Sequence, residues 1–218
     1  MPDVPNRAEL ERRLIREISR ADVTTRRELY ALLGDPPQLA NLTPQVWDDI
    51  AQRYSGVIAP ALERVFIDSS ELFLSQVGLA VGEGIVQTRA GAWAAEYGAN
   101  LVNNLNTTSR REIGRLVGNY FQDGQTIGEL QDNIQRVVYN PTRAKLIAQT
   151  EITRANVEAE IEMVEELGNT LAAKWVTNRD DLVCPICGPL DGRAYGDLWV
   201  MYPPAHPGCR CWVVWEPV

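Results

Sequence analysis

Histidine and cysteine are scarce in this chain of 218 residues, which has one histidine and four cysteines. All five lie between Cys184 and Cys211. No residue before this segment can therefore act as a thiol nucleophile, a histidine base or a histidine ligand to a metal. Catalytic triads need a nucleophile and a base, and both would have to come from this short segment. The scarcity excludes most triad chemistry.

Basic residues are outnumbered by acidic ones. The sequence has 21 lysines and arginines against 29 aspartates and glutamates, which gives a formal net charge of −8. A protein that coats duplex DNA neutralises phosphates with an excess of cations, so this balance excludes non-specific coating of DNA. The apolar content of 45% and the charged content of 23% are ordinary for a folded globular chain. The length suits one large domain or two small ones.

Long hydrophobic runs are absent. Residues 1–27 contain seven arginines and no apolar core of a signal peptide. The longest weakly charged stretch, 72–95, is interrupted by Glu83 and Arg89 and is too polar to span a membrane. We therefore expect a soluble protein with no membrane partner. We also expect a reducing cytoplasm, where clustered cysteines favour metal binding over disulfides.

Up to Gly168 the sequence predicts one helix after another, because apolar residues recur at three- and four-residue spacing. Pro60 is expected to kink a helix rather than to end it. Signals for helix starts recur at Thr43-Pro44, Ser109-x-x-Glu112, Thr126-x-x-Glu129 and Asn140-Pro141. The last of them opens a predicted helix over 141–167, with Gly168 as its C-terminal stop.

Helical periodicity ends after Gly168. Residues 174–218 hold six of the 13 prolines, four of the six tryptophans, and every cysteine and histidine. Strands are predicted at 173–177 and 211–215, where apolar and β-branched residues cluster.

The predicted fold is mainly α, with a helical N-terminal part followed by a small α+β C-terminal module that has a Cys/His zinc-type knuckle. We expect a helical N-terminal domain over 1–106 and a second domain over 107–218. The second domain would comprise long helices at 107–168 and a Cys-rich strand module at 174–218.

Five candidate metal ligands stand in two short groups, Cys184-Pro-Ile-Cys187 and, after 18 residues, His206-Pro-Gly-Cys209-Arg-Cys211. A C-x-x-C knuckle lets two thiolates converge on one tetrahedral ion, and a second knuckle closes the site. Strand alternation would place Cys209 and Cys211 on one face, which suits four thiolates or three thiolates with His206. About 45 residues with little periodicity do not bury a sufficient core unaided. We therefore predict a structural zinc ion, with a disulfide pair or a catalytic metal as alternatives.

Two other functions are open at this point. One is a metal-dependent hydrolase or nuclease, but the deaminase and H-E-x-x-H patterns are absent. A site filled by four ligands also leaves no position for water, so no catalytic or cofactor-binding residue is predicted. The other is a zinc ribbon that binds nucleic acid. Against it, the cations of the module are scattered and its tryptophans suit a small core; these cations are Lys174, Arg179, Arg193 and Arg210.

The last predicted helix carries the polar residues Thr150, Glu151, Arg154 and Asn156. Glu151 and Arg154 are spaced to pair along the helix surface. An active-site role for Glu151 would lack a histidine, a nucleophile or a metal ligand nearby in the sequence. The simpler interpretation is an amphipathic helix whose polar residues hold the following strands in place.

Several short motifs follow one another in a characteristic order. They are Thr150-Glu151-x-x-Arg154-Ala-Asn156, Trp175-x-Thr177-x-x-Asp180, Cys184-Pro-x-Cys187, Leu190-Asp191-Gly192 and Pro203-Pro204-x-His206-Pro-x-Cys209-Arg-Cys211. In this order they resemble the phage Mu F-like minor head proteins, also called phage head morphogenesis proteins. The resemblance covers residues 107–218, whereas residues 1–106 resemble the family only in their helical character.

The resemblance implies a minor structural protein of a tailed-phage head that takes part in procapsid assembly, contacts the portal, and has a role in DNA packaging or ejection. It implies portal or other capsid proteins as partners, no small-molecule substrate and no enzymatic activity. The protein would be made in the cytoplasm of the host bacterium and located in the virion, in the capsid interior or at the portal vertex.

The N-terminal segment differs from the rest of the chain in charge. Between Arg7 and Arg27, seven arginines stand against four acidic residues. We expect this arm to contact an acidic partner surface such as the portal or, more weakly, packaged DNA. A solvated helix with mixed charge pairs is the alternative.

Overall fold

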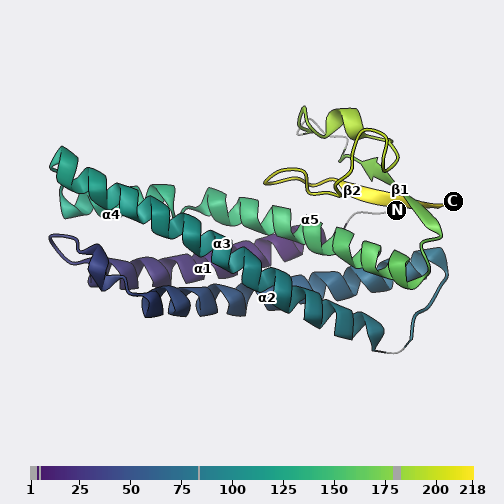
Figure 1. Cartoon of the computed structure of the whole chain (residues 1–218), viewed down its shortest axis with the longest axis horizontal. Helices are drawn as coiled ribbons and strands as arrows, with labels where there is room; N and C mark the ends of the chain where they lie inside the picture. The colour runs from purple at the N-terminus through teal and green to yellow at the C-terminus, as the bar shows by residue number, and fades with distance from the viewer. Residues whose placement is uncertain (1–3, 5, 83, 179–182) are drawn as a thin grey trace. The chain divides into compact units, whose positions relative to one another are not determined.

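The computed structural model describes residue 4 and residues 6–82, 84–178 and 183–218. In this part of the chain, α-helices come first and a two-stranded sheet follows (Figure 1). The α-helices are α1 (Arg7–Leu33), α2 (Pro44–Val77), α3 (Ile85–Asp123), α4 (Ile127–Val137) and α5 (Pro141–Glu166). Short 3-10 helices stand at η1 (Leu39–Asn41) and η2 (Gly188–Leu190), and the strands are β1 (Leu171–Val176) and β2 (Trp212–Pro217). The predicted fold class is confirmed.

The chain divides into two compact units that are both discontinuous in sequence. Residues 1–12, 60–94 and 145–218 form one, which we call the sheet unit. Residues 13–59 and 95–144 form the other, the helical unit. The predicted division between 106 and 107 lies inside α3, where the chain does not pass from one unit to the other. The division into domains over 1–106 and 107–218 stays a prediction.

The helical unit is held by apolar packing and by a few buried polar contacts. Ile18, Leu29 and Ile134 are among its fully buried side chains. The Tyr54 hydroxyl donates a hydrogen bond to the buried carboxylate of Asp22. Burial raises the pKa of Asp22 above its ordinary value, although the hydrogen bond from Tyr54 opposes this. The unit therefore contains a carboxylate that is costly to bury and is retained by its hydrogen-bonding partner.

Two identical capping patterns have different outcomes. The Thr126 hydroxyl accepts a hydrogen bond from the Glu129 backbone N–H at 3.3 Å, and the Glu129 carboxylate accepts from the Thr126 N–H at 2.7 Å. This capping box starts α4 as predicted. The helix start predicted at Ser109 is wrong, because α3 continues through it and the Ser109 hydroxyl donates to the Leu105 carbonyl at 2.8 Å. A glycine with φ of +64°, Gly124, precedes the true cap, whereas no glycine or proline interrupts the helix before Ser109.

Other local signals mark helix ends as predicted, whereas the kink expected at Pro60 stays a prediction. α2 begins at Pro44, continues through Pro60 and ends at Val77. α5 ends at Glu166, and Gly168 adopts a φ of +82° that suits glycine at a helix C-terminus. Each strand begins and ends within two residues of the predicted bounds. No α-helix in the described residues is long and apolar enough to cross a membrane.

Tryptophan side chains lie at the centre of the sheet unit. β1 and β2 pair in antiparallel register, with Trp175 opposite Val213 and Ala173 opposite Trp215. Trp175 is fully buried, and its ring meets that of Trp199 edge to face at 5.3 Å between centroids. The tryptophans therefore form a small core, as the sequence predicted.

Candidate metal centre

All five predicted ligands lie in the sheet unit, in two loops. Cys184 and Cys187 stand in the turn that leads into η2, and His206, Cys209 and Cys211 stand in the segment before β2. Cys209 and Cys211 precede the strand, which begins at Trp212, so they lie in an irregular segment rather than on the predicted strand. The predicted convergence occurs by a different local geometry from the one expected.

Short distances join the donor atoms of the two loops. Nε2 of His206 lies 3.0 Å from Sγ of Cys184 and 3.4 Å from Sγ of Cys187. Sγ of Cys187 lies 3.8 Å from Sγ of Cys209. The donors form two groups of three, and within each group the ligand atoms lie within 4.8 Å of one another. The groups are Cys184, Cys187 and His206, and Cys187, Cys209 and Cys211. Cys187 belongs to both groups.

The geometry suits a tetrahedral metal ion better than a disulfide. With zinc–sulfur bonds of about 2.3 Å, two thiolates of a tetrahedral site stand roughly 3.8 Å apart. A disulfide needs about 2.05 Å between sulfurs, and all four cysteines are free thiols. The cluster could therefore hold a metal ion, and the donors are of the soft and imidazole types that zinc prefers.

Burial and hydrogen bonds shift the four thiols in different directions: the pKa is lowered for Cys184 and Cys209 and raised for Cys187 and Cys211. Metals bind the charged form of a thiol. The hydrogen bond from the Cys211 side chain lowers the pKa of Cys209 to about 5. Burial opposes ionisation of Cys184, but backbone N–H groups, including that of Cys187 at 3.3 Å, hold the pKa of Cys184 below its ordinary value. Burial and the neighbouring Cys209 raise the pKa of Cys187 to about 12. A cation at the centre would favour deprotonation of all of them.

Helix α5 holds the second loop of the cluster. The Thr150 hydroxyl accepts a hydrogen bond from the Gly208 N–H at 2.7 Å, and the Thr153 hydroxyl donates to the Cys209 carbonyl at 2.8 Å. Thr153 also accepts from the Arg7 guanidinium at 3.0 Å. The polar residues of this helix, Thr150 among them, were expected to hold the following strands, and Thr150 holds the loop that precedes β2. The role of Thr153 was missed because a threonine in a helix carries no sequence signal for such a contact.

The same helix also holds strand β2. The Trp215 indole N–H donates to the Glu160 carboxylate at 2.8 Å, and the Asn156 amide donates to the same carboxylate at 3.3 Å. Both acceptor and donors are buried. Glu151 and Arg154 approach to 3.7 Å at the predicted spacing. Arg179 and Asp180, which the sequence analysis named, lie outside the described residues.

Replacing Gly208 by alanine is expected to weaken metal binding by about tenfold to a hundredfold, as changes next to metal ligands do. Gly208 has a φ of +77°, which strains any residue with a Cβ, and that Cβ would meet Leu146 Cδ2 at 2.9 Å. The shift would disturb the N–H bond to Thr150 and the adjacent Cys209. Competition with a chromogenic chelator measures the affinity.

Gly196 provides the matched control. Its φ is +87°, and a Cβ there would meet no atom within 4 Å. Gly196→Ala therefore introduces similar backbone strain outside the cluster and should leave metal affinity unchanged. Equal loss of affinity in both variants would contradict the assigned role of Gly208.

Comparison with known families identifies this part of the chain. Residues 111–214 match the family model described as Phage Mu protein F like protein. Residues 111–214 are a phage Mu F-like domain. The match includes all five metal-ligand candidates and the polar residues of α5, and it confirms the resemblance expected from the motifs. No curated protein and no solved structure matches the chain significantly.

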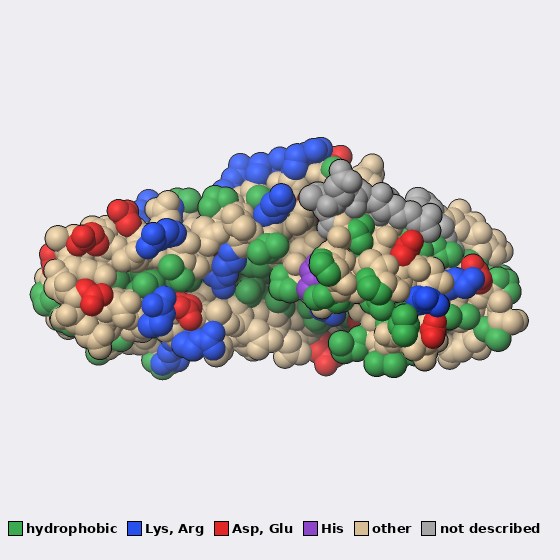
Figure 2. All heavy atoms as spheres, turned by 90° about the horizontal axis from the view of Figure 1, so that it is seen from above, with side chains coloured by type: hydrophobic (Ala, Val, Ile, Leu, Met, Phe, Trp, Pro, Cys, Tyr) green, Lys and Arg blue, Asp and Glu red, His purple; other side chains and the backbone are tan. Residues whose placement is uncertain are grey.

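The Mu F-like domain presents its histidine at the surface. Figure 2 shows the side chain beside hydrophobic neighbours, and His206 is partly exposed, whereas Cys187, Cys209 and Cys211 are buried. A metal held by these donors would therefore be shielded on the thiol side.

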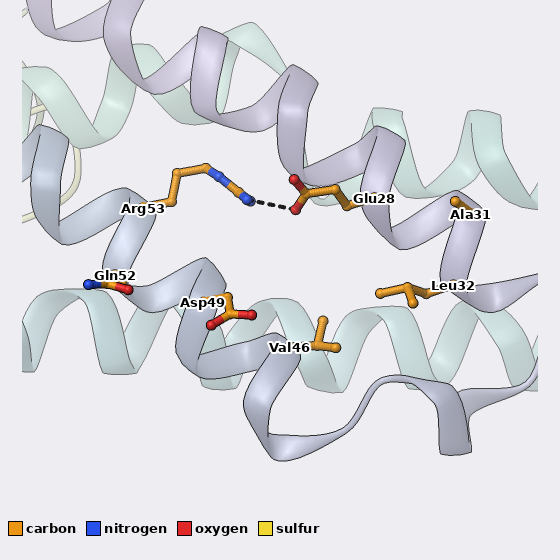
Figure 3. A pocket seen from close by; sticks show the side chains of 7 residues that line it. All are labelled: Glu28, Ala31, Leu32, Val46, Asp49, Gln52 and Arg53. Carbon is orange, nitrogen blue, oxygen red and sulfur yellow. Dashed lines mark hydrogen bonds and ion pairs between the residues drawn. The ribbon is translucent and has the colours of Figure 1, made fainter.

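The helical unit carries a groove whose lining differs chemically from that of the cysteine cluster (Figure 3). It lies between α1 and α2, has a volume of about 830 Å³, and is bordered by an ion pair of Arg53 and Glu28 at 2.6 Å. Its lining residues include no thiol or imidazole. Within the described chain, the donor atoms suited to a transition metal are thus those of the Mu F-like domain.

Proposed function

We propose that the protein is a minor structural protein of a tailed-phage head, and that a zinc ion stabilises its Mu F-like domain. The observation that carries this is the family match over 111–214, which contains the converging Cys184, Cys187, His206, Cys209 and Cys211. The family is one of head morphogenesis rather than of enzymes. We therefore assign the metal a structural role.

Zinc would supply stability that the small module lacks. Four of the five donors fill a tetrahedral site and leave no position for water, so the ion would act by holding the two loops together. The loops contact each other through these donors, and the second loop also contacts α5 through Thr150 and Thr153. Metal binding would thus fasten the segment before β2 to the helix.

We further propose that the protein is incorporated into the procapsid through contact with the portal or another capsid protein. The net charge of −8 favours protein partners over extensive contact with packaged DNA. Part of the positive charge of α1 is neutralised within the helix, since Arg13 pairs with Glu17 at 3.1 Å and Arg7 with Glu11 at 3.5 Å. Any contact of this arm with DNA would be weak.

The proposal is tested by removing the coding sequence from its phage or prophage and purifying the particles produced after induction. We expect wild-type particles to contain the chain in few copies by quantitative mass spectrometry. We also expect the deletion to lower the yield of infectious particles by at least tenfold, with restoration by the gene supplied in trans. A head function would be refuted if wild-type particles lack the chain and the deletion leaves the yield of infectious particles unchanged.

A further inference from the structure

The sheet unit contains a cavity that lies away from the cysteine cluster. It has a volume of about 290 Å³ and is bounded by the end of α5, by β1 and by the loop that follows Ala194. Its walls include the rings of Tyr195, Tyr202 and Trp215 and the side chain of Glu165. The proposed structural role of the metal makes no use of this cavity.

The aromatic rings of the cavity form a connected stack. Tyr195 and Tyr202 are nearly parallel, with centroids 4.8 Å apart and an angle of 15° between planes. Tyr202 and Trp215 follow at 6.0 Å and 28°. The Trp215 ring is fixed by its hydrogen bond to Glu160, and the Tyr195 hydroxyl donates to the Val200 carbonyl at 3.1 Å. The aromatic wall is therefore organised before any ligand binds.

One acidic side chain lines the cavity. Among the described residues that line the cavity, Glu165 alone is charged. Burial raises the pKa of Tyr202 above its ordinary value, and the charges of Glu165 and Glu158 act in the same direction. The nearby Arg89 pairs with Glu162 and Glu166 instead, the latter at 2.6 Å. No ion pair joins Glu165 to a cation in the described part of the chain.

We propose that this cavity binds an arginine side chain of a partner protein. A planar guanidinium stacks on aromatic rings and forms paired hydrogen bonds with a carboxylate, and the cavity is lined by aromatic rings and by the Glu165 carboxylate. Its volume suits one side chain, because sites for larger ligands occupy about 300–1,000 Å³. The proposal rests on the lining of the cavity and does not depend on the proposed head function.

The surroundings of the cavity point to a protein rather than to a small amine as the source of the guanidinium. The loop between the two tyrosines exposes Leu198 by 57%, Val200 by 71% and Met201 by 75%. Neighbouring exposed apolar side chains mark surfaces that contact other proteins. An arginine anchored in the cavity would bring its flanking residues onto this loop.

The test uses the zinc-loaded full chain with aromatic ring labels and nuclear magnetic resonance titration. The probes are N-acetyl-arginine amide and N-acetyl-citrulline amide, which share a shape and differ in charge. We expect signals of Tyr195, Tyr202 and Trp215 to shift with arginine, with an affinity about tenfold above that for citrulline. Equal affinities, or arginine-induced shifts only elsewhere, would overturn the proposal.

Two charge-matched variants separate the cavity from general attraction to an acidic protein. Glu165→Gln should lower the affinity for arginine several-fold and leave that for citrulline unchanged. Glu96→Gln removes the same charge from an exposed position on α3 in the helical unit. It should change neither the affinity for arginine nor that for citrulline. Tyr195→Leu, at a ring that is 47% exposed, should weaken arginine binding without unfolding the unit. Identical behaviour of the Glu165 and Glu96 variants would refute the assignment.

Discussion

Replacing Cys187 by serine is expected to abolish tight metal binding and to unfold the segment that follows α5. Cys187 is the donor shared by both groups of the cluster and is 1% exposed. Structural zinc contributes on the order of 10 kcal/mol to folding in small zinc peptides, and most of this would be lost with the shared ligand. The zinc content of the purified chain and the near-ultraviolet circular dichroism of its tryptophans measure the two effects.

Ile186→Ser is the control for this variant. Ile186 lies in the same knuckle, is 59% exposed, and carries no donor atom, so its replacement should leave zinc content and tryptophan signal unchanged. In the wild-type chain, a chelator should reproduce the effect of Cys187→Ser while most helical signal persists. If Cys187→Ser binds zinc as tightly as the wild-type chain, the proposed metal centre is excluded.

Replacing Trp175 by alanine is expected to lower the free energy of unfolding of the metal-loaded chain by about 3–5 kcal/mol, the usual cost of removing a large buried aromatic side chain. Trp175 is 0% exposed, lies in the middle of β1 opposite Val213, and packs edge to face on Trp199. Its removal would open a cavity beneath the sheet. Urea unfolding of the zinc-loaded protein, followed by tryptophan fluorescence, measures the change.

Trp175→Phe separates the effect of lost side-chain volume from the effect of the unpaired indole N–H. The Trp175 indole N–H has no hydrogen-bond partner among the described residues. Phenylalanine keeps an aromatic ring and removes this unpaired donor, so it should cost clearly less than alanine. A loss for phenylalanine as large as that for alanine would show that the edge of the indole, rather than filling of the core, stabilises the sheet.

Local sequence signals predicted the helix ends well where a proline or glycine stood close to the capping residue. Thr43-Pro44 and Thr126 mark true helix starts, and Gly168 follows the end of α5. Ser109 has the same pattern as Thr126 but lies within α3. The difference is decided by the preceding residues, because a cap needs a chain that has left the helical conformation.

The sequence by itself predicted the candidate donors, the family segment and the mainly α class, because these depend on residue identity and on spacing over a few positions. Only the tertiary structure decided that Thr153 holds the Cys209 carbonyl and that Glu160 holds the Trp215 indole. It also decided that tyrosines and an acid from separate segments enclose one cavity. Such contacts join residues more than 50 positions apart, and their register depends on how β1, β2 and α5 pack rather than on any local pattern.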